Sequence, residues 1–211
     1  ENLFQRNRIF MDRTKNTGAI SAERALNYGF TGPNLRAAGV DYDVRIQSPY
    51  SSYEDFQFNV PVGTTGDNYD RWLVRGKEMW ESLSIIEQAY QKVQDKNMPK
   101  DQPFHADVPE FYLPPKEEVY NNMEALIWHF KIVMGETDIP KGEVYHSVEA
   151  GNGELGFYLI SDGGRTPYRL HFRRPCFIYY QAFEELTKGA MLSDAIMTMS
   201  SLNLIAGEMD A

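Results

Sequence analysis

Residues 142–177 read GEVYHSVEAGNGELGFYLISDGGRTPYRLHFRRPCF, and this stretch decides the fold. It holds three runs rich in apolar residues, the first followed by Gly151-Asn152-Gly153 and the second by Asp162-Gly163-Gly164. An Asn-Gly pair favours the tight turn of a β-hairpin. Pro175 ends the third run, because proline has no N–H to donate to a strand ladder. The stretch therefore predicts a small antiparallel sheet of three strands over residues 142–174.

The three runs differ in their expected burial. In residues 144–149, Val144, His146 and Val148 alternate with Tyr145, Ser147 and Glu149, as the two faces of a strand do. Residues 155–160 are apolar on both faces, as the central strand of a sheet is. Residues 169–173 alternate again and are expected to be half-buried. In the central run we expect Leu155, Phe157 and Leu159 to be buried. At Gly156 we expect a close approach of another part of the chain to the backbone.

Helices are expected where apolar residues recur every three or four positions. Ser21 is placed to cap a short helix that Gly29 ends. A long helix is expected from about residue 68 to about residue 96, as a core helix of a bundle. The other expected helices cover residues 116–134, 180–188 and 192–202.

Three stretches lack helical periodicity. Residues 31–61 are rich in Gly, Pro, Tyr and Asp, and are expected to form a long loop that is either functional or wrapped around the core. Residues 97–115 hold five prolines and are expected to connect two helices. Residues 203–211 form a tail. The predicted fold class is α+β, with a helical bundle portion in residues 1–135, the sheet at 142–174, and short helices with the tail at 178–211.

Composition limits the classes of protein to which the chain can belong. It has 211 residues, 42% hydrophobic and 13% aromatic, which fits a globular protein. The net charge of −9 argues against a nucleic-acid partner, because phosphate contacts need a basic surface. No stretch approaches the ~20 apolar residues of a membrane span, so any membrane association is expected to pass through partner proteins. One cysteine, Cys176, excludes an internal disulfide and a multi-thiolate metal site within one copy.

No combination of residues indicates catalytic chemistry or a metal centre. The four histidines show no metal-ligand spacing such as HxxxH, and His129 is better explained as a satisfied or interface histidine. His146 and His171 lie on separate expected strands, and the sequence leaves open whether they meet. Salt bridges explain one charged cluster better than anion binding does: Arg165, Arg169, Arg173 and Arg174 with Glu149, Glu154 and Asp162.

Several long motifs resemble a known family. They are TGPNLRAAGVDYDVRIQSPYSSYEDFQFNVPVG at residues 31–63, MEALIWHFK at 123–131, the stretch quoted above, and the closing GEMDA at 207–211. In this order they resemble the quinone-site subunit of the respiratory proton-pumping NADH:quinone oxidoreductase, complex I, which is related to the large subunit of nickel-iron hydrogenases. The resemblance covers nearly the whole chain. It implies that residues 1–211 are the C-terminal portion of one larger subunit.

The resemblance also implies a role for the tail. The hydrogenase subunit binds nickel through a C-terminal cysteine pair, and Ile205 and Glu208 stand where those cysteines would be. Both thiolates are missing, and Cys176 is far away in sequence. The implied site is therefore a quinone cavity with no metal, whose C-terminal wall includes Ile205, Asn203 and Gly207. The family usually has Asp in place of Asn203, Arg in place of Ala211, and often a basic residue in place of Asn152.

The remaining implications concern cofactors and partners. The chain is expected to bind no cofactor; quinone is the substrate, while NADH, FMN and the iron-sulfur clusters sit on partner subunits. Its partners are other complex I subunits, especially the adjacent iron-sulfur subunit, on the cytoplasmic side of the inner membrane. The resemblance also implies that the residues that hold the quinone headgroup lie upstream of Glu1. Because residues 1–211 show no redox-cofactor motif and no catalytic combination, the chain alone is expected to be inactive. The alternatives are a hydrogenase-type large subunit and a structural scaffold module of a membrane redox complex.

Overall fold

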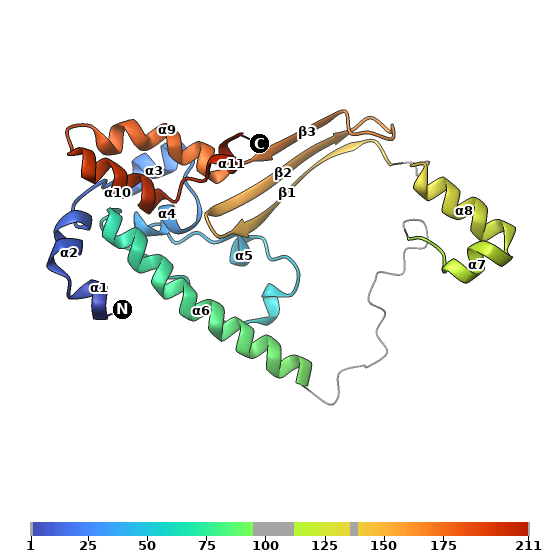
Figure 1. The fold of residues 1–211 in the computed structure, drawn as a ribbon, viewed down its shortest axis with the longest axis horizontal. Coiled ribbons are helices and arrows are strands. Elements are labelled where there is room, and N and C mark those ends of the chain that lie inside the picture. The colour runs from blue at the N-terminus through green and yellow to red at the C-terminus, as the bar shows by residue number, and fades with distance from the viewer. Residues whose placement is uncertain (1, 95–111, 136–138, 211) are drawn as a thin grey trace. The chain divides into compact units, whose positions relative to one another are not determined.

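The computed structural model is α+β, with helices and one three-stranded sheet (Figure 1). It describes residues 2–94, 112–135 and 139–210. Most of the proline-rich connection, with His105, and the last residue, Ala211, lie outside the described residues. The chain divides into two compact units, and each is described by itself. Unit 1 comprises Glu1–Asp95, His146–Gly156 and Phe172–Ala211; unit 2 comprises Lys96–Tyr145 and Phe157–His171.

The first helices of unit 1 follow local signals in the sequence. Ser21 caps α3, accepting a hydrogen bond from the N–H of Arg24 at 3.3 Å, and Gly29 ends this helix with a φ of 81°, as predicted. The segment 31–61 is not a continuous loop, because proline near the start of one short helix and an Asp cap on another support helical turns. The helical elements up to this point are α1 (Asn2–Gln5), α2 (Arg8–Thr14), α3 (Ala22–Tyr28), α4 (Gly32–Ala37), α5 (Val44–Gln47) and the 3-10 turn η1 (Tyr53–Asp55).

The long helix α6 runs from Asn68 to Gln94, and its predicted start is confirmed. Its buried residues, however, lie only near its beginning: Asn68, Asp70, Arg71 and Val74. The expectation of a core helix along its whole length is wrong within the described residues. Large side chains on its later turns are exposed, and these are Met79, Trp80, Leu83, Ile86, Tyr90 and Val93.

Unit 2 contains two helices where the sequence indicated one. These are α7 (Lys116–Asn121) and α8 (Met123–Val133). Asn122 separates them with an extended backbone, and its side chain accepts a hydrogen bond from the N–H of Glu124 at 2.9 Å. Asparagine is a strong N-cap, so a new helix begins here although the apolar pattern continues.

The predicted sheet is confirmed. Its strands β1 (Gly142–Ala150), β2 (Gly153–Ser161) and β3 (Arg169–Arg173) pair in the order β1-β2-β3, with the first turn at Gly151 and Asn152. Because β2 lies between β1 and β3, His146 and His171 are on strands that do not pair with each other.

The burial expected for the sheet is only partly observed. Gly156 is buried, but Leu155 and Leu159 are half-buried and Phe157 is 38% exposed. On β3, Leu170 and Phe172 are exposed, so this strand is not half-buried. A close approach that only a glycine permits is found at the hairpin tip, at Gly153, and the expected one at Gly156 stays a prediction. A Cβ added to Gly153 would meet the Tyr179 hydroxyl at 2.4 Å and the Thr31 hydroxyl at 2.8 Å.

The C-terminal elements are α9 (Pro175–Thr187), α10 (Leu192–Leu202) and α11 (Ala206–Asp210). The helix α9 begins five residues before the predicted residue 180, since Pro175 can open a helix as readily as it ends a strand. The helix α10 has its predicted bounds. Part of the expected tail forms the short helix α11, which contacts α9.

The core of unit 1 lies among α3, α4, α9 and α10. Figure 1 shows α9 and α10 beside each other, and both pack in this core. Aromatic contact adds to the aliphatic burial, since the rings of Phe30 and Tyr179 meet edge to face with centroids 4.8 Å apart. The buried apolar residues of the cluster are Ile20, Ala25, Phe30, Leu35, Ala38, Tyr179, Ala182, Leu186 and Leu202.

A buried arginine joins α4 to α6 and to the end of β1. Arg36 on α4 lies 2.6 Å from a carboxylate oxygen of Glu78 and 2.9 Å from one of Glu149. A third carboxylate, that of Asp43, lies 3.5 Å away. Removing one partner of such a buried ion pair is strongly destabilising, because it leaves an uncompensated charge in the interior. The network therefore fixes the start of the hairpin turn against the helices.

Candidate functional site

One cavity of unit 1 brings the tail and the hairpin together. Its volume is about 450 Å³. The β1–β2 hairpin, the first residue of α9 and the chain around α11 each contribute side chains to its wall. The lining residues are Ala150, Gly151, Asn152, Leu155, Pro175, Asn203, Ile205 and Glu208. Two of the three predicted site residues, Asn203 and Ile205, therefore line one cavity.

Amide side chains connect the two sides of this cavity. The Asn203 side chain donates a hydrogen bond to the side-chain oxygen of Asn152. The nitrogen of the Asn152 amide lies 3.4 Å from a carboxylate oxygen of Glu208. Asn152 is 8% exposed, whereas Asn203 is exposed. Two neutral amides that can each donate and accept hydrogen bonds therefore line this side of the cavity, next to the Glu208 carboxylate.

Glu208 caps the helix α9. The N-cap position, Arg174, makes no side-chain capping bond, and the N–H of Cys176 instead donates to Glu208 at 2.9 Å. A carboxylate at a helix N-terminus is favoured by the free N–H groups and by the helix dipole. Arg174 in turn donates to the carbonyl oxygen of Met209 at 3.2 Å. These contacts hold α11 against the start of α9.

Cys176 lies directly behind the cavity wall. Its sulfur is 3.4 Å from the carbonyl oxygen of Asn203 and 3.3 Å from the amide nitrogen of Asn152. Cys176 is far from the tail in sequence, but the fold brings its thiol into contact with the tail. Burial and the neighbouring Glu208 carboxylate raise the pKa of the thiol to about 11, so the thiol is neutral near pH 7.

Gly207 does not line the cavity. It lies in α11, and a Cβ added to it would meet no atom within 4 Å. The open space around Gly207 leaves its backbone accessible, and its role in a quinone wall stays a prediction. Sequence reasoning missed Asn152, Leu155 and Pro175, which line the cavity from the hairpin and from α9. Asn152 drew attention only because the family often has a basic residue there.

The walls are suited to a flat, largely apolar molecule. Ile205, Leu155 and Pro175 offer aliphatic surface, and the two asparagines offer polar contacts. Glu208 is the one ionisable side chain among the residues that line the cavity. Within the described ranges, no group of three or more His, Cys, Asp or Glu side chains is arranged to hold a metal ion.

Comparison with known proteins identifies the family. A family model described as "Respiratory-chain NADH dehydrogenase, 49 Kd subunit" matches residues 1–211. The chain belongs to this family. The second D subunit of the NADH-quinone oxidoreductase from Cytophaga hutchinsonii is 76% identical over 211 residues, all of this chain and 53% of that protein. The D subunits of the same oxidoreductase are 70% identical in Flavobacterium psychrophilum and 56% identical in Leptospira biflexa, where the match covers the whole chain and 50% of each protein.

This member of the family spans about half the length of the curated relatives it matches. Of its helices that the structure describes, none combines the length and apolar character needed to cross a membrane.

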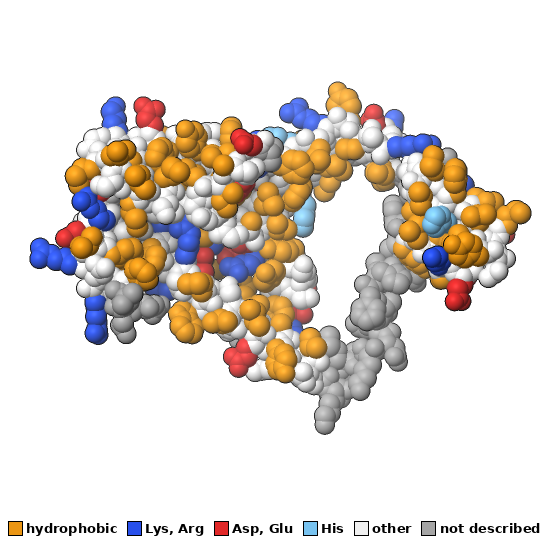
Figure 2. Space-filling view, in the orientation of Figure 1, with side chains coloured by type: hydrophobic (Ala, Val, Ile, Leu, Met, Phe, Trp, Pro, Cys, Tyr) orange, Lys and Arg blue, Asp and Glu red, His pale blue; other side chains and the backbone are white. Residues whose placement is uncertain are grey.

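The family member also exposes apolar surface on α6. Figure 2 shows hydrophobic side chains along this helix, on the face in view. A groove of about 480 Å³ in unit 1 runs beside Trp72, Gly76, Met79 and Leu83. An added Cβ at Gly76 would meet nothing within 4 Å, so the surface there is open in this chain.

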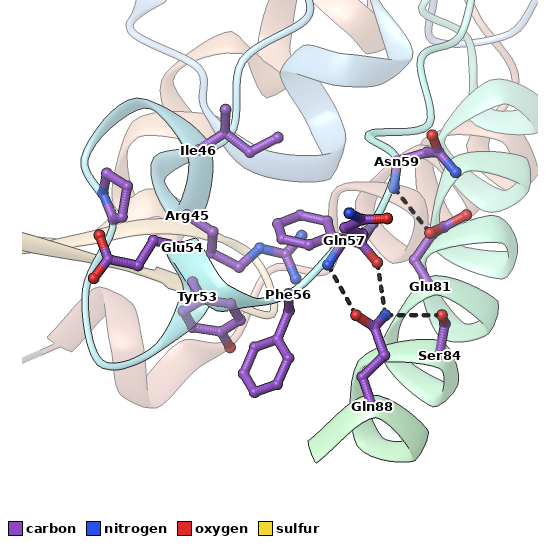
Figure 3. Close-up of a pocket in the computed structure, with 12 residues that line it drawn as sticks. Arg45, Ile46, Tyr53, Glu54, Phe56, Gln57, Asn59, Glu81, Ser84 and Gln88 are labelled. Atoms are coloured by element: carbon purple, nitrogen blue, oxygen red, sulfur yellow. Dashed lines mark hydrogen bonds between the residues drawn. The ribbon is translucent and has the colours of Figure 1, made fainter. Parts of the chain in front are cut away.

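A larger cavity of about 900 Å³ lies between residues 45–59 and the later turns of α6 (Figure 3). Side chains of α6 bind the backbone of the extended segment there. The Gln88 amide accepts from the N–H of Gln57 at 2.9 Å and donates to its carbonyl oxygen at 2.7 Å. Glu81 accepts from the N–H of Asn59 at 2.9 Å. These bonds attach the segment to the helix, and none of the predicted site residues lines this cavity.

Proposed function

We propose that this chain is the C-terminal portion of the quinone-site subunit of a proton-pumping NADH:quinone oxidoreductase. In this proposal the cavity at the tail forms part of the wall of the quinone site. The family assignment supports membership of this enzyme complex. The observation that carries the site is that Asn203 and Ile205 line one cavity with Leu155, Pro175 and the amide of Asn152. The bound quinone headgroup would need this combination of aliphatic wall and few polar groups.

We also propose kinship with the hydrogenase large subunit, which rests on the sequence resemblance of the tail. Ile205 and Glu208 stand at the positions of that subunit's cysteine pair, and both residues line the cavity. Neither can supply a thiolate, and the one thiol nearby, Cys176, is held neutral by its surroundings. The proposed wall therefore occupies the place of a former metal site.

The proposal includes the partners and the location. NADH, FMN and the iron-sulfur clusters belong to other subunits, and the tail meets the adjacent iron-sulfur subunit on the cytoplasmic side of the inner membrane. Residues that hold the quinone headgroup lie outside residues 1–211. The chain by itself is then expected neither to oxidise NADH nor to reduce quinone.

The test is Ile205→Trp in the full-length subunit, assembled with its partners. The added bulk is expected to raise the KM for a short-chain quinone such as decylubiquinone, while electron transfer from NADH to ferricyanide stays unchanged. Leu192→Trp is the matched control, because Leu192 is 80% exposed on α10 and does not line the cavity. Unchanged quinone kinetics in an assembled Ile205→Trp complex would contradict the proposal and favour a structural scaffold module.

A further inference from the structure

The last turn of α10 leads directly into the wall of the cavity. The helix ends at Leu202, and Asn203 follows with a left-handed φ of 57°. The final carbonyl groups of a helix have no partners within the helix and must be satisfied from outside. The N–H of Asn203 bonds the carbonyl oxygen of Ser200 at 3.1 Å. The carbonyl groups of Ser201 and Leu202 are bound by side chains of two other helices.

Arg75 on α6 and Asn34 on α4 bind these two carbonyl groups together. Arg75 donates from Nη1 to the carbonyl oxygen of Ser201 at 2.6 Å. Asn34 donates from Nδ2 to the carbonyl oxygen of Leu202 at 3.2 Å. Arg75 also donates from Nη2 to the side-chain oxygen of Asn34 at 3.0 Å. The planar guanidinium of Arg75 thus binds the end of α10 and the side chain of Asn34 at the same time. We call Arg75 and Asn34 the clamp on α10.

Buried groups fix the same turn from its other side. Arg71 donates from Nη1 to the hydroxyl of Ser201 at 3.1 Å and to the side-chain oxygen of Asn68 at 2.8 Å. The Ser201 hydroxyl lies 2.7 Å from that same Asn68 oxygen. Arg71, Asn68 and Asn34 are fully or almost fully buried. The start of α6 therefore holds the last turn of α10 in position.

Electrostatics favours the contact between Arg75 and α10. The C-terminal end of a helix carries a partial negative charge, which attracts a cation. Burial lowers the pKa of Arg75 from its usual range. In the part of the chain that the structure describes, no carboxylate lies within ion-pair distance of Arg75. The carbonyl and amide oxygens that it binds help to stabilise its charge.

The held peptide group is close to the wall residues. The carbonyl group that Asn34 binds belongs to the peptide bond between Leu202 and Asn203. Rotation of this peptide would move the Asn203 side chain, and Ile205 follows two residues later. Wall residues of a binding site keep their geometry only when a supporting layer fixes them.

We propose that Arg75 and Asn34 are positioning residues for the quinone wall, which hold Asn203 and Ile205 in place by binding the last carbonyl groups of α10. This inference rests on the proposed function of the cavity. It assigns an effect on quinone binding to two residues that do not line the cavity themselves.

The first test is Arg75→Lys in the full-length subunit of the assembled oxidoreductase. Lysine keeps the positive charge but lacks the planar fork, so it cannot bind Ser201 and Asn34 in the same way. We expect the KM for decylubiquinone to rise by about 10-fold, since misplacement by 1 Å can cost a site roughly 100-fold. The rate from NADH to ferricyanide and the yield of assembled complex are expected to stay unchanged.

A second variant and a matched control separate this role from helix stability. Asn34→Asp replaces the donor to Leu202 with an oxygen but keeps an acceptor for Arg75, and we expect it to raise the KM in the same direction. Arg13→Lys is the control at the opposite end of α10, where Arg13 contacts Asp194 at 3.1 Å and Ser193 at 3.3 Å. It is expected to leave the quinone KM unchanged.

The outcomes distinguish this inference from the proposed function. If Ile205→Trp raises the quinone KM while Arg75→Lys and Asn34→Asp do not, the positioning role is overturned and the proposed function stands. If Ile205→Trp also has no effect, the proposed function itself fails. An equal rise in Arg13→Lys would attribute the effect to α10 as a whole and overturn the positioning role. Should Arg75→Lys not assemble, Asn34→Asp decides the question.

Discussion

The side-chain amide of Asn203 donates a hydrogen bond to the side-chain oxygen of Asn152 and so joins the tail to the tip of the β1–β2 hairpin. The same Asn152 side chain reaches Cys176 and Glu208 through its nitrogen. Three segments of unit 1 therefore meet at one buried amide. Both asparagines are neutral, so the contact depends on hydrogen-bond geometry and changes little with salt.

Asn152→Ala is expected to lower the free energy of unfolding of the chain by about 1–3 kcal/mol, because it leaves buried polar partners without bonds. Urea titration measures this change. Asn27→Ala is the control, since Asn27 is exposed on α3, and its effect is expected to stay within about 0.5 kcal/mol. Equal effects of the two substitutions would show that the Asn152 amide does not hold the tail.

Tyr179→Phe is expected to destabilise the chain by about 1–3 kcal/mol while leaving its shape unchanged. The Tyr179 hydroxyl lies 2.6 Å from the carbonyl oxygens of Thr31 and Asn152, and the side chain is fully buried. Tyr120→Phe provides the comparison, because Tyr120 is 76% exposed. Thermal unfolding of both variants gives the difference, and a shift no larger for Tyr179 than for Tyr120 would contradict this account of the hairpin tip.

The stability of the chain is expected to fall in acid partly through Asp70. Burial acts to raise the pKa of this carboxyl, but the N–H groups of Thr65 and Thr64, at 2.6 and 2.9 Å, outweigh it and hold the pKa below 3.8. A carboxyl whose pKa is lower in the folded state stabilises the fold above its unfolded pKa. That contribution is lost as the pH falls through the folded pKa.

Asp70→Asn is therefore expected to reduce the free energy of unfolding at pH 7 and to have a much smaller effect near pH 2. Urea titrations of both proteins across this range give the comparison. Asp12→Asn is a suitable control, because Asp12 is 68% exposed and pairs with Arg8 on the surface. A loss of stability from Asp70→Asn that is the same at both pH values would rule out the linkage.

Local signals in the sequence were enough to predict the sheet and several helix ends. The Asn-Gly turn and the two-residue alternation act between neighbouring residues, and so do the Ser21 cap and the left-handed Gly29. Asn122 is the exception, because its capping bond to Glu124 is also local and yet the continuous apolar pattern on either side concealed it.

Contacts between distant residues could not be read from the sequence in the same way. Arg75 and Ser201 are 126 positions apart, and Asn34 and Leu202 are 168 apart. No periodicity links such pairs, so the clamp on α10 and the position of Cys176 beside the tail were missed. The apolar pattern of α6 predicted a helix correctly, but a pattern does not say which chain covers the apolar face. Of the candidate site, Asn203 and Ile205 came from the family resemblance rather than from any local signal.

The last prediction concerns two glycines that have opposite roles. Gly32 has a φ of 61°, and a Cβ there would lie 2.3 Å from the Cα of Gly153. Because the added Cβ would meet backbone atoms of Gly153, these atoms cannot move aside unless the hairpin tip shifts away from α4. Gly32→Ala is expected to cost roughly 1–2 kcal/mol for the left-handed backbone and about 1–3 kcal/mol more for overpacking.

Gly76 lies inside α6 with open space around its Cα. Gly76→Ala is therefore expected to stabilise the chain by about 1 kcal/mol, through helix propensity alone. Urea titration of the two variants measures both changes, and a tolerated Gly32→Ala would show that the hairpin tip does not rest on α4.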